Sequence, residues 1–173
     1  KAIAKLWWKT ELSPPTLEYL EMILTAVADH GPAVSGAHNA IVSASAGKDT
    51  MSALCSGLLT IGPRFGGAVD GAAQAFYFAH KNGLSPQEFV DEMKEKGERI
   101  PGIGHKVKSI HNPDSRVAEL SNFAELNFPN MPVTKFAREV ELITTAKRAN
   151  LILNVDGLIG ASLVDILLPQ LPE

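Results

Sequence analysis

The sequence predicts an all-α fold, and three observations support this prediction. Apolar residues recur at helical spacing in nearly every patterned segment, and glycine, proline and capping residues mark the ends of those segments. Only the short run "LILNV" at 151–155 is compatible with a buried strand, and a helical pattern follows it after Gly157. With 173 residues, 45% of them hydrophobic, the chain is long enough for one substantial core or two modest ones.

The N-terminal part is predicted to contain helices of two kinds. Residues 16–30 repeat leucine at helical spacing, and Gly31-Pro32 ends that pattern. Residues 36–59 are rich in alanine, serine and glycine, which let helix backbones approach closely, so we expect buried helices with Cys55 in the core. A subunit interface would suit the same composition, and the sequence does not distinguish the two.

The C-terminal part contains further predicted helices with clear end signals. The clearest is the amphipathic segment 85–97, in which Ser85 is the N-cap and Glu88 completes a capping box. Pro113-Asp114 opens another. The remaining helical patterns cover 65–83, 113–128, 132–148 and 157–168.

Composition and charge exclude several classes of function. The net charge is -3, so no broad basic face is expected for nucleic acid, and phosphate groups would need local basic residues. The single cysteine cannot form an internal disulfide, which favours a reducing compartment. No apolar run reaches the roughly 18–20 residues of a membrane span, and the first residues do not form a signal peptide. We therefore expect a soluble intracellular protein.

Three stretches combine an ionisable residue with glycine: "ADHGPAVSGAH", "PGIGHKVKSIHNPDSR" and "LNVDGLIG". Each has a structural alternative. His30 beside a glycine suits a helix end, Asp156 suits a helix cap, and the central loop suits a tight connection with lysines in water.

The combination of these stretches favours catalysis. Asp156 has hydrophobic neighbours on both sides, and burial would raise its pKa toward neutrality, which suits a proton-transferring base. His105 follows a Gly-x-Gly turn that lets the main chain approach a ligand. Arg116 offers a planar fork that matches a carboxylate. These are the groups needed for carbon–carbon bond chemistry beside a carbonyl.

A metal site and a phosphate-binding loop are less well supported. The five histidines form no H-E-x-x-H pair and there is no cysteine pair, so a structural zinc site is rejected. The stretch "PGIGH" lacks the preceding strand and the G-K-[ST] ending of a P-loop.

The three stretches resemble the motifs of the citrate synthase superfamily. "PGIGHKVKSIHNPDSR" is similar to its P-G-x-G-H…D-P-R signature, "NVDG" to its catalytic N-V-D segment, and "DHGPAVSGAH" to its histidine segment. "LWWKTELSPP" and "AGKDTMSALCSGLLTIGPRFGGAVDGAA" are similar to the citryl-CoA lyase module of ATP-citrate lyases. The resemblance covers essentially the whole chain and implies an all-α fold whose large and small domains close over the substrate.

The reaction that the resemblance implies is retro-Claisen cleavage of citryl-CoA into acetyl-CoA and oxaloacetate. Asp156 would exchange the proton of the acetyl methyl carbon, and His105 would hydrogen-bond the citryl hydroxyl. His30 and Arg116 would hold carboxylates. Coenzyme A would meet the main chain of Ile100, Gly102, Ile103 and Gly104 at its adenine, and Lys147 and Arg148 at its phosphates.

Two further residues assigned to substrate binding depart from parts of this superfamily. Phe65 stands where ordinary citrate synthases have a second catalytic histidine, and the lyase branch shares the phenylalanine. Lys106 stands where much of the lyase branch has arginine, so the charge remains without bidentate geometry. Phe65 argues against a divergent citrate synthase. That reading is retained as an alternative, together with a catalytically incomplete CoA-binding or oligomerisation fragment.

The resemblance also sets expectations about the wider protein. Residues 1–173 are expected to be a fragment of the family's domain, truncated at both ends, with a small-domain portion at approximately 66–150. ATP and magnesium would act in a separate ATP-grasp, CoA-ligase part, so that citrate, CoA and ATP yield acetyl-CoA, oxaloacetate, ADP and phosphate. We expect a cytoplasmic homo-oligomer, a dimer or a tetramer.

Overall fold

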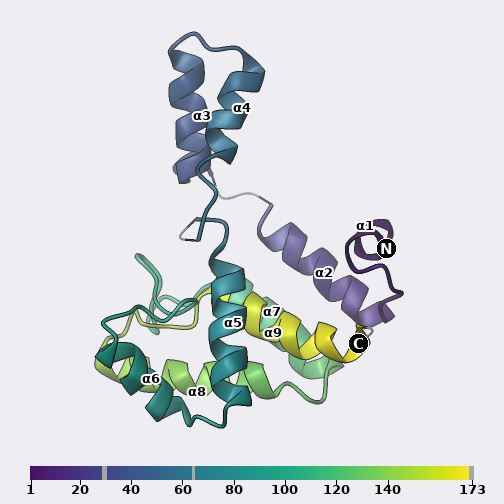
Figure 1. The fold of residues 1–173 in the computed structure, drawn as a ribbon, viewed down its shortest axis with the longest axis vertical. Coiled ribbons are helices and arrows are strands. Elements are labelled where there is room, and N and C mark those ends of the chain that lie inside the picture. Colours follow the sequence, from purple (N-terminus) through teal and green to yellow (C-terminus); the bar gives the residue numbers. More distant parts are fainter. Residues whose placement is uncertain (29–30, 64, 172–173) are drawn as a thin grey trace.

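The computed structural model describes residues 1–28, 31–63 and 65–171, and it confirms the all-α prediction. Within these ranges the regular structure is helical, and β-structure is limited to isolated bridges. The helices are α1 (Ala2–Trp8), α2 (Pro14–Ala26), α3 (Ser35–Ser45), α4 (Thr50–Leu58), α5 (Ala68–Lys81), α6 (Pro86–Glu95), α7 (Ser115–Asn127), α8 (Pro132–Lys147) and α9 (Val155–Leu167), followed by the short η1 (Leu168–Gln170) (Figure 1). None of the described helices is long and apolar enough to cross a membrane.

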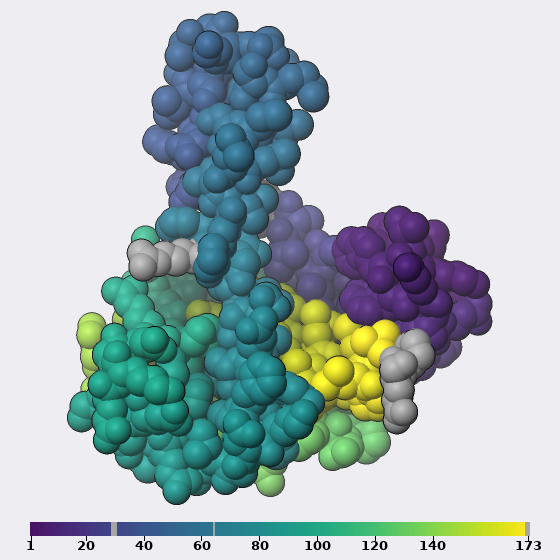
Figure 2. Space-filling view, in the orientation of Figure 1, coloured from purple at the N-terminus to yellow at the C-terminus, as the bar shows by residue number. Residues whose placement is uncertain are grey.

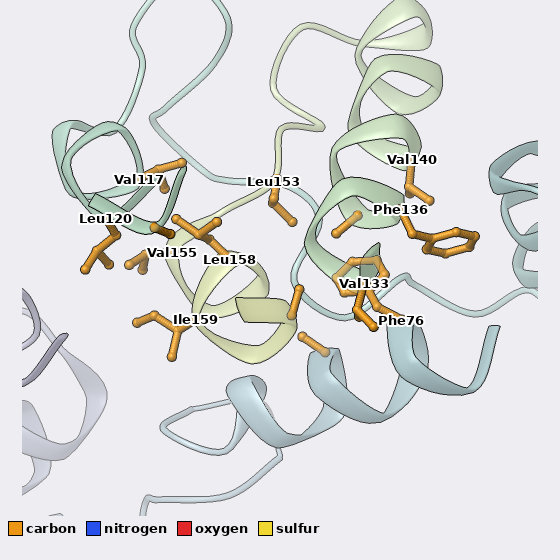
Figure 3. Close-up of a cluster of buried hydrophobic side chains, with 14 of the residues drawn as sticks. Phe76, Val117, Leu120, Val133, Phe136, Val140, Leu153, Val155, Leu158 and Ile159 are labelled. Carbon is orange, nitrogen blue, oxygen red and sulfur yellow. The ribbon is translucent and has the colours of Figure 1, made fainter. Parts of the chain in front are cut away.

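Helix α9 is the centre of the molecule's body. It contacts α2, α5, α7 and α8, and nine of its residues are buried. Its contact with α5 is the closest because Gly160 lets the two backbones meet: a Cβ at this position would lie 2.6 Å from the Val69 carbonyl oxygen. Figure 3 shows side chains of α9 packed between those of α5, α7 and α8, among them Leu158, Ile159, Phe76, Leu120 and Phe136.

Helix α8 is fixed on α9 by a carboxylate from α9 itself. Asp165 accepts hydrogen bonds from the backbone N–H groups of Val133 (3.0 Å) and Thr134 (2.8 Å), in the first turn of α8. These N–H groups have no partner within their own helix, so the carboxylate acts as a cap supplied from a neighbouring element. Burial raises the pKa of Asp165.

The end signals read from the sequence are largely confirmed. Ser85 and Glu88 form the capping box of α6, and Asp114 is the N-cap of α7. The structural alternative for Asp156 is wrong, because the N-cap of α9 is Asn154, whose side chain accepts a hydrogen bond from Gly157. Helix α1 was not predicted; it has no side-chain cap, and Trp8 at its end packs against a small cluster that includes Leu167.

The predicted burial of residues 36–59 is wrong for this chain. Helices α3 and α4 pack on each other as a hairpin that projects from the body (Figures 1 and 2). Gly36 and Gly57 allow this contact, because a Cβ at Gly57 would lie 2.9 Å from the Gly36 carbonyl oxygen. Ala53 is the buried residue of the hairpin, and Cys55 is exposed rather than in the core. The small residues thus build a two-helix contact, and the larger apolar ones face outward.

Candidate active site

An extended segment at 150–154 brings the loop between α6 and α7, residues 96–114, to the start of α9; we call this loop the histidine loop because it carries His105. Gly104 donates its N–H to the Ile152 carbonyl (2.7 Å), and Asn154 donates its N–H to the Gly102 carbonyl (2.9 Å). Together these bonds form an antiparallel bridge between Ile103 and Leu153. The strand suggested at 151–155 is therefore an extended segment with a single bridge, and it fixes the loop against the helix that carries Asp156.

Two glycines allow the loop and the helix to touch. Gly102 has a φ of +80°, and a Cβ there would lie 2.5 Å from the Cα of Gly157. A Cβ on Gly157 would in turn lie 2.4 Å from the Gly102 carbonyl oxygen. No side chain fits at either position without moving the backbone. Gly102, predicted to contact coenzyme A, is buried in this contact.

The imidazole of His105 is oriented by its own loop. Its Nδ1 accepts hydrogen bonds from the backbone N–H groups of Val107 (3.0 Å) and Lys108 (2.9 Å). In a neutral ring the proton therefore sits on Nε2, which is a donor. The backbone on either side is held by Asn150, whose carbonyl accepts from His105 N–H (3.0 Å) and whose amide donates to the His105 carbonyl (3.2 Å). His105 is half-buried and presents a fixed N–H donor.

Asp156 lies in the first turn of α9, immediately beside the loop. The side chain of Asn154 donates to the Gly104 carbonyl (2.9 Å) and accepts from Gly157 N–H (3.0 Å), so it ties this turn to the loop. Asp156 is half-buried, whereas its neighbours Val155 and Gly157 are buried. The hydrophobic flanks therefore face the core, and the carboxylate lies at its edge.

Arg116 is held rigidly at the start of α7. Its Nε and Nη2 donate to Oδ1 (3.0 Å) and Oδ2 (2.6 Å) of Asp114, whose side chain is 4% exposed. This hydrogen bonding lowers the pKa of Asp114 and raises that of Arg116, and the charge of Asp156 raises the pKa of Arg116 further. The fork predicted to bind a substrate carboxylate thus already engages one carboxylate and lies within electrostatic reach of a second.

Beside this cluster lies a groove of about 650 Å³ between α6, the histidine loop and the end of α8. We name it the basic groove because its lining contains five basic side chains, Lys94, Arg99, Lys106, Lys147 and Arg148, and one acidic side chain, Glu98. Its remaining lining residues are Val90, Met93, Ile100, Ile103, Gly104, His105, Thr144, Asn150 and Leu151. Five of the six residues predicted to bind coenzyme A line this groove, all except Gly102.

Two predicted residues lie elsewhere. Phe65 is 52% exposed in the connection between α4 and α5, where it pairs through its backbone with Gly62, and it is not part of the groove lining. His30 lies outside the described residues. Within the described chain, no group of three or more histidine, cysteine, aspartate or glutamate side chains could hold a metal ion.

The prediction from sequence missed two polar residues of α8, Glu141 and Thr144, that bond to the extended segment. Thr144 Oγ1 donates to the Leu151 carbonyl (2.7 Å), and Glu141 accepts from Leu153 N–H (2.8 Å). The signal was present: both residues continue the stripe of Ala137 and Val140 at helical spacing, and a charged side chain within such a stripe needs a partner.

Comparison with known proteins identifies the family of this chain. The sequence matches the family "Citrate synthase, C-terminal domain" over residues 1–170. The chain belongs to the citrate synthase family. It is 56% identical over 162 residues to human ATP-citrate synthase, covering 94% of this chain and 15% of the human protein.

Two solved structures share the fold. ATP citrate lyase from Methanothrix soehngenii, in complex with citrate and coenzyme A, superposes with a TM-score of 0.90 at 57% identity, over 95% of this chain and 27% of that one. Citryl-CoA lyase from Hydrogenobacter thermophilus superposes with a TM-score of 0.81 at 30% identity, over 94% of this chain and 64% of that one. The chain spans between 15% and 27% of the length of the curated relatives that it matches.

The Asp114–Arg116 pair predicts an acid-dependent stability. The pKa of Asp114 is lower in the folded chain than in the unfolded chain, where it is ~4. The ionised carboxylate therefore contributes to the free energy of unfolding above pH ~4, and this contribution is lost as the pH falls through the folded pKa. Asp114→Asn keeps an N-cap acceptor and removes the charge, so we expect a loss of about 1–2 kcal/mol at pH 7 that shrinks below pH ~4. Denaturant unfolding between pH 7 and pH 3 measures this difference.

Asp91→Asn is the matched control, because Asp91 is exposed and, among the described residues, its side chain bonds only to the neutral side chain of Gln87. A difference between Asp114→Asn and wild type that stays constant across this pH range would contradict the assignment.

Proposed function

We propose that this chain carries the citryl-CoA lyase activity of an ATP-citrate lyase, cleaving citryl-CoA into acetyl-CoA and oxaloacetate. The observation that carries the proposal is the pairing of 102–105 with 150–154, which holds His105 and Asp156 together beside the basic groove. His105 offers an N–H donor, and Asp156 offers a half-buried carboxyl group beside the fixed cation of Arg116.

The chemistry requires one broken carbon–carbon bond and one transferred proton. As the bond between the carbinol carbon and the CH₂ carbon of the citryl group breaks, its electron pair remains on the CH₂ carbon next to the thioester. The hydroxyl releases its proton to water and becomes the keto group of oxaloacetate, while Nε2–H of His105 donates a hydrogen bond to that oxygen. Protonated Asp156 delivers a proton to the CH₂ carbon, which becomes the methyl group of acetyl-CoA. Water returns a proton to Asp156, so one proton leaves oxygen, one reaches carbon and no co-reactant is consumed.

We place coenzyme A in the basic groove on the basis of charge. Lys147 and Arg148 at the end of α8 and Lys106 after the histidine supply cations for its phosphates. The main chain of Ile100, Ile103 and Gly104 forms the wall proposed for adenine. Lys106 contributes a point charge where an arginine would make two parallel bonds. His30 and Phe65 retain their proposed substrate-binding roles, and the division into a large domain and a small domain at about 66–150 likewise stays a prediction.

The wider setting is proposed from the relatives. Proteins named ATP-citrate synthase extend far beyond this chain, so ATP and magnesium chemistry is assigned to an ATP-grasp, CoA-ligase part elsewhere in the enzyme. We place the activity in the cytoplasm. A CoA-binding piece without catalysis is the second candidate, because five of the groove-lining residues could bind phosphates whether or not the catalytic pair turns over.

We also propose that the whole protein is a homo-oligomer joined through the α3–α4 hairpin. The hairpin exposes large apolar side chains on both helices, and its helical residues carry no Lys, Arg, Asp or Glu that would select a charged partner. The exposed set is Ile41, Val42, Met51, Leu54 and Leu58. A self-complementary apolar surface of this kind suits a second copy of the same chain across a two-fold axis.

Replacing the proposed proton donor tests the activity directly. In the whole protein that contains this chain, Asp156→Asn is expected to lower kcat for citryl-CoA cleavage by about 10²- to 10⁴-fold, because an amide cannot transfer the proton. Oxaloacetate release is followed by its reduction in a coupled assay. Asp70→Asn, exposed at the start of α5, is expected to leave kcat unchanged. Unaltered turnover in Asp156→Asn would refute the assignment, and an inactive wild type that still binds CoA would favour the second candidate.

Neutralising the groove is expected to weaken CoA binding. Lys147→Ala combined with Arg148→Ala should raise the Kd for CoA by about 5- to 50-fold, and the loss should shrink at high salt because both residues are exposed. Isothermal titration at two ionic strengths measures this. Lys135→Ala, at the other end of α8, removes one positive charge outside the groove and should leave Kd unchanged. Equal effects from both sites would mean that only the overall charge matters.

A charge on the hairpin tests the oligomer. Leu54→Glu should lower the molar mass measured by light scattering to that of a single copy, because a buried carboxylate would lack a partner. Leu142→Glu, 71% exposed on α8, is the control and should keep the wild-type mass. A wild type that is already monomeric, or an oligomer that survives Leu54→Glu, would show that the hairpin is not the interface.

A further inference from the structure

The extended segment 150–154 uses both of its edges, in the manner of a central strand. Even-numbered residues bond to the histidine loop: the carbonyls of Asn150 and Ile152 accept from it, and the N–H of Asn154 donates to it. Odd-numbered residues face α8. This alternation follows from extended backbone, in which neighbouring residues point their polar groups to opposite edges. The loop therefore supports only one edge of the segment that leads into Asp156.

Side chains of α8 supply the partners for the other edge. Thr144 Oγ1 donates to the Leu151 carbonyl (2.7 Å), and Glu141 Oε1 accepts from Leu153 N–H (2.8 Å). Leu153 is 1% exposed, so its N–H could not bond to water if Glu141 were removed. Of the two α8 residues, Glu141 holds the part of the segment that bridges to Ile103 and lies nearest to Asp156.

The carboxylate of Glu141 is itself held in place. Its other oxygen, Oε2, accepts from Nη1 of Arg138 (3.0 Å), and Nη2 of Arg138 donates to the buried hydroxyl of Ser121 on α7. Helix α7 also carries Arg116 in its first turn. One polar chain therefore runs from the helix of Arg116, across α8, to the main chain that carries Asp156.

We infer that Glu141 is a positioning residue for the active site. Its carboxylate accepts the hydrogen bond from Leu153 N–H that a neighbouring strand would accept in a sheet, and so holds the segment that joins His105 to Asp156. The expected effect of Glu141 on kcat rests on the proposed lyase function. Its expected effect on the order of segment 150–154 rests on the hydrogen bonds alone. The alternative is a purely structural role, in which Glu141 forms an ion pair with Arg138 and stabilises α8. The two roles use different oxygens of the same carboxylate, so they can be separated.

Three variants of the whole protein separate these roles. Glu141→Ala removes both bonds. Glu141→Gln combined with Arg138→Gln removes the ion pair, yet the neutral amide of the new Gln side chain can still accept from Leu153 N–H. Glu139→Ala, also on α8, is the control, because Glu139 makes no hydrogen bond or ion pair with the described residues. Each variant is assayed for kcat and KM with citryl-CoA and for amide hydrogen exchange of 102–106 and 150–156.

A positioning role predicts a split between kcat and KM. Glu141→Ala should lower kcat by about 10- to 100-fold, because small displacements of a catalytic group are costly, while KM changes by less than about 3-fold. The double variant should recover kcat to within about 3-fold of wild type. Equal loss of kcat in the two variants would show that the ion pair, rather than the bond to Leu153, matters, and would overturn the inference.

Hydrogen exchange tests whether Glu141 orders the segment 150–154, and this test holds even if the protein does not cleave citryl-CoA. In Glu141→Ala the amides of 150–156 and 102–106 should exchange at least about 10-fold faster, and those of α5 should keep wild-type rates. The double variant should restore protection. Unchanged protection in Glu141→Ala would overturn the inference. A wild-type protein that does not cleave citryl-CoA, but whose segment loses protection in Glu141→Ala, would refute the lyase assignment and leave the positioning role supported.

Discussion

The contact between Gly102 and Gly157 sets the distance between the histidine loop and the helix of Asp156. Their backbones meet where a single Cβ on either residue would lie only 2.5 Å or 2.4 Å from an atom of the other, the separation of two atoms bonded to a common third atom. The positive φ of Gly102 then turns its carbonyl toward Asn154 N–H. The histidine loop must pack against the start of α9, orient the imidazole of His105 and form one wall of the basic groove. These requirements explain why it is rich in glycine and proline.

Helix α8 serves three purposes at once in this all-α chain. Its start is capped by Asp165, which fixes it on α9. Its middle supplies Glu141 and Thr144 to the outer edge of the extended segment. Its end brings Lys147 and Arg148 to the basic groove. A helical fold can hold a buried extended segment only if side chains replace the strand that a sheet would provide, because buried main-chain groups need partners.

The sequence was informative where the interaction is local and less so where it is distant. The capping box of Ser85 and Glu88 spans three residues, and both the residue types and the spacing reveal it. A glutamate in the apolar stripe of α8 signals that Glu141 needs a partner, but that partner, the N–H of Leu153, is a distant main-chain group with no residue-type signature. Small apolar residues at 36–59 predicted close packing, which the hairpin has, but composition could not say whether the remaining faces are covered within the chain. The motif resemblance brought together His105, Arg116 and Asp156, which periodicity alone would have left in separate elements.

Local charge, rather than total charge, explains how an acidic protein can present a site for anions. The chain carries a net charge of -3, yet the basic groove collects five cationic side chains against one carboxylate. Salt at physiological strength screens charges beyond about 8 Å, so acidic residues on distant helices contribute little to the potential inside the groove. These cations come from three separate elements, α6, the histidine loop and α8, and the pairing of 102–105 with 150–154 holds the loop beside the end of α8. The same hydrogen bonds that orient the imidazole therefore also assemble the basic groove, so both features depend on one piece of main-chain geometry.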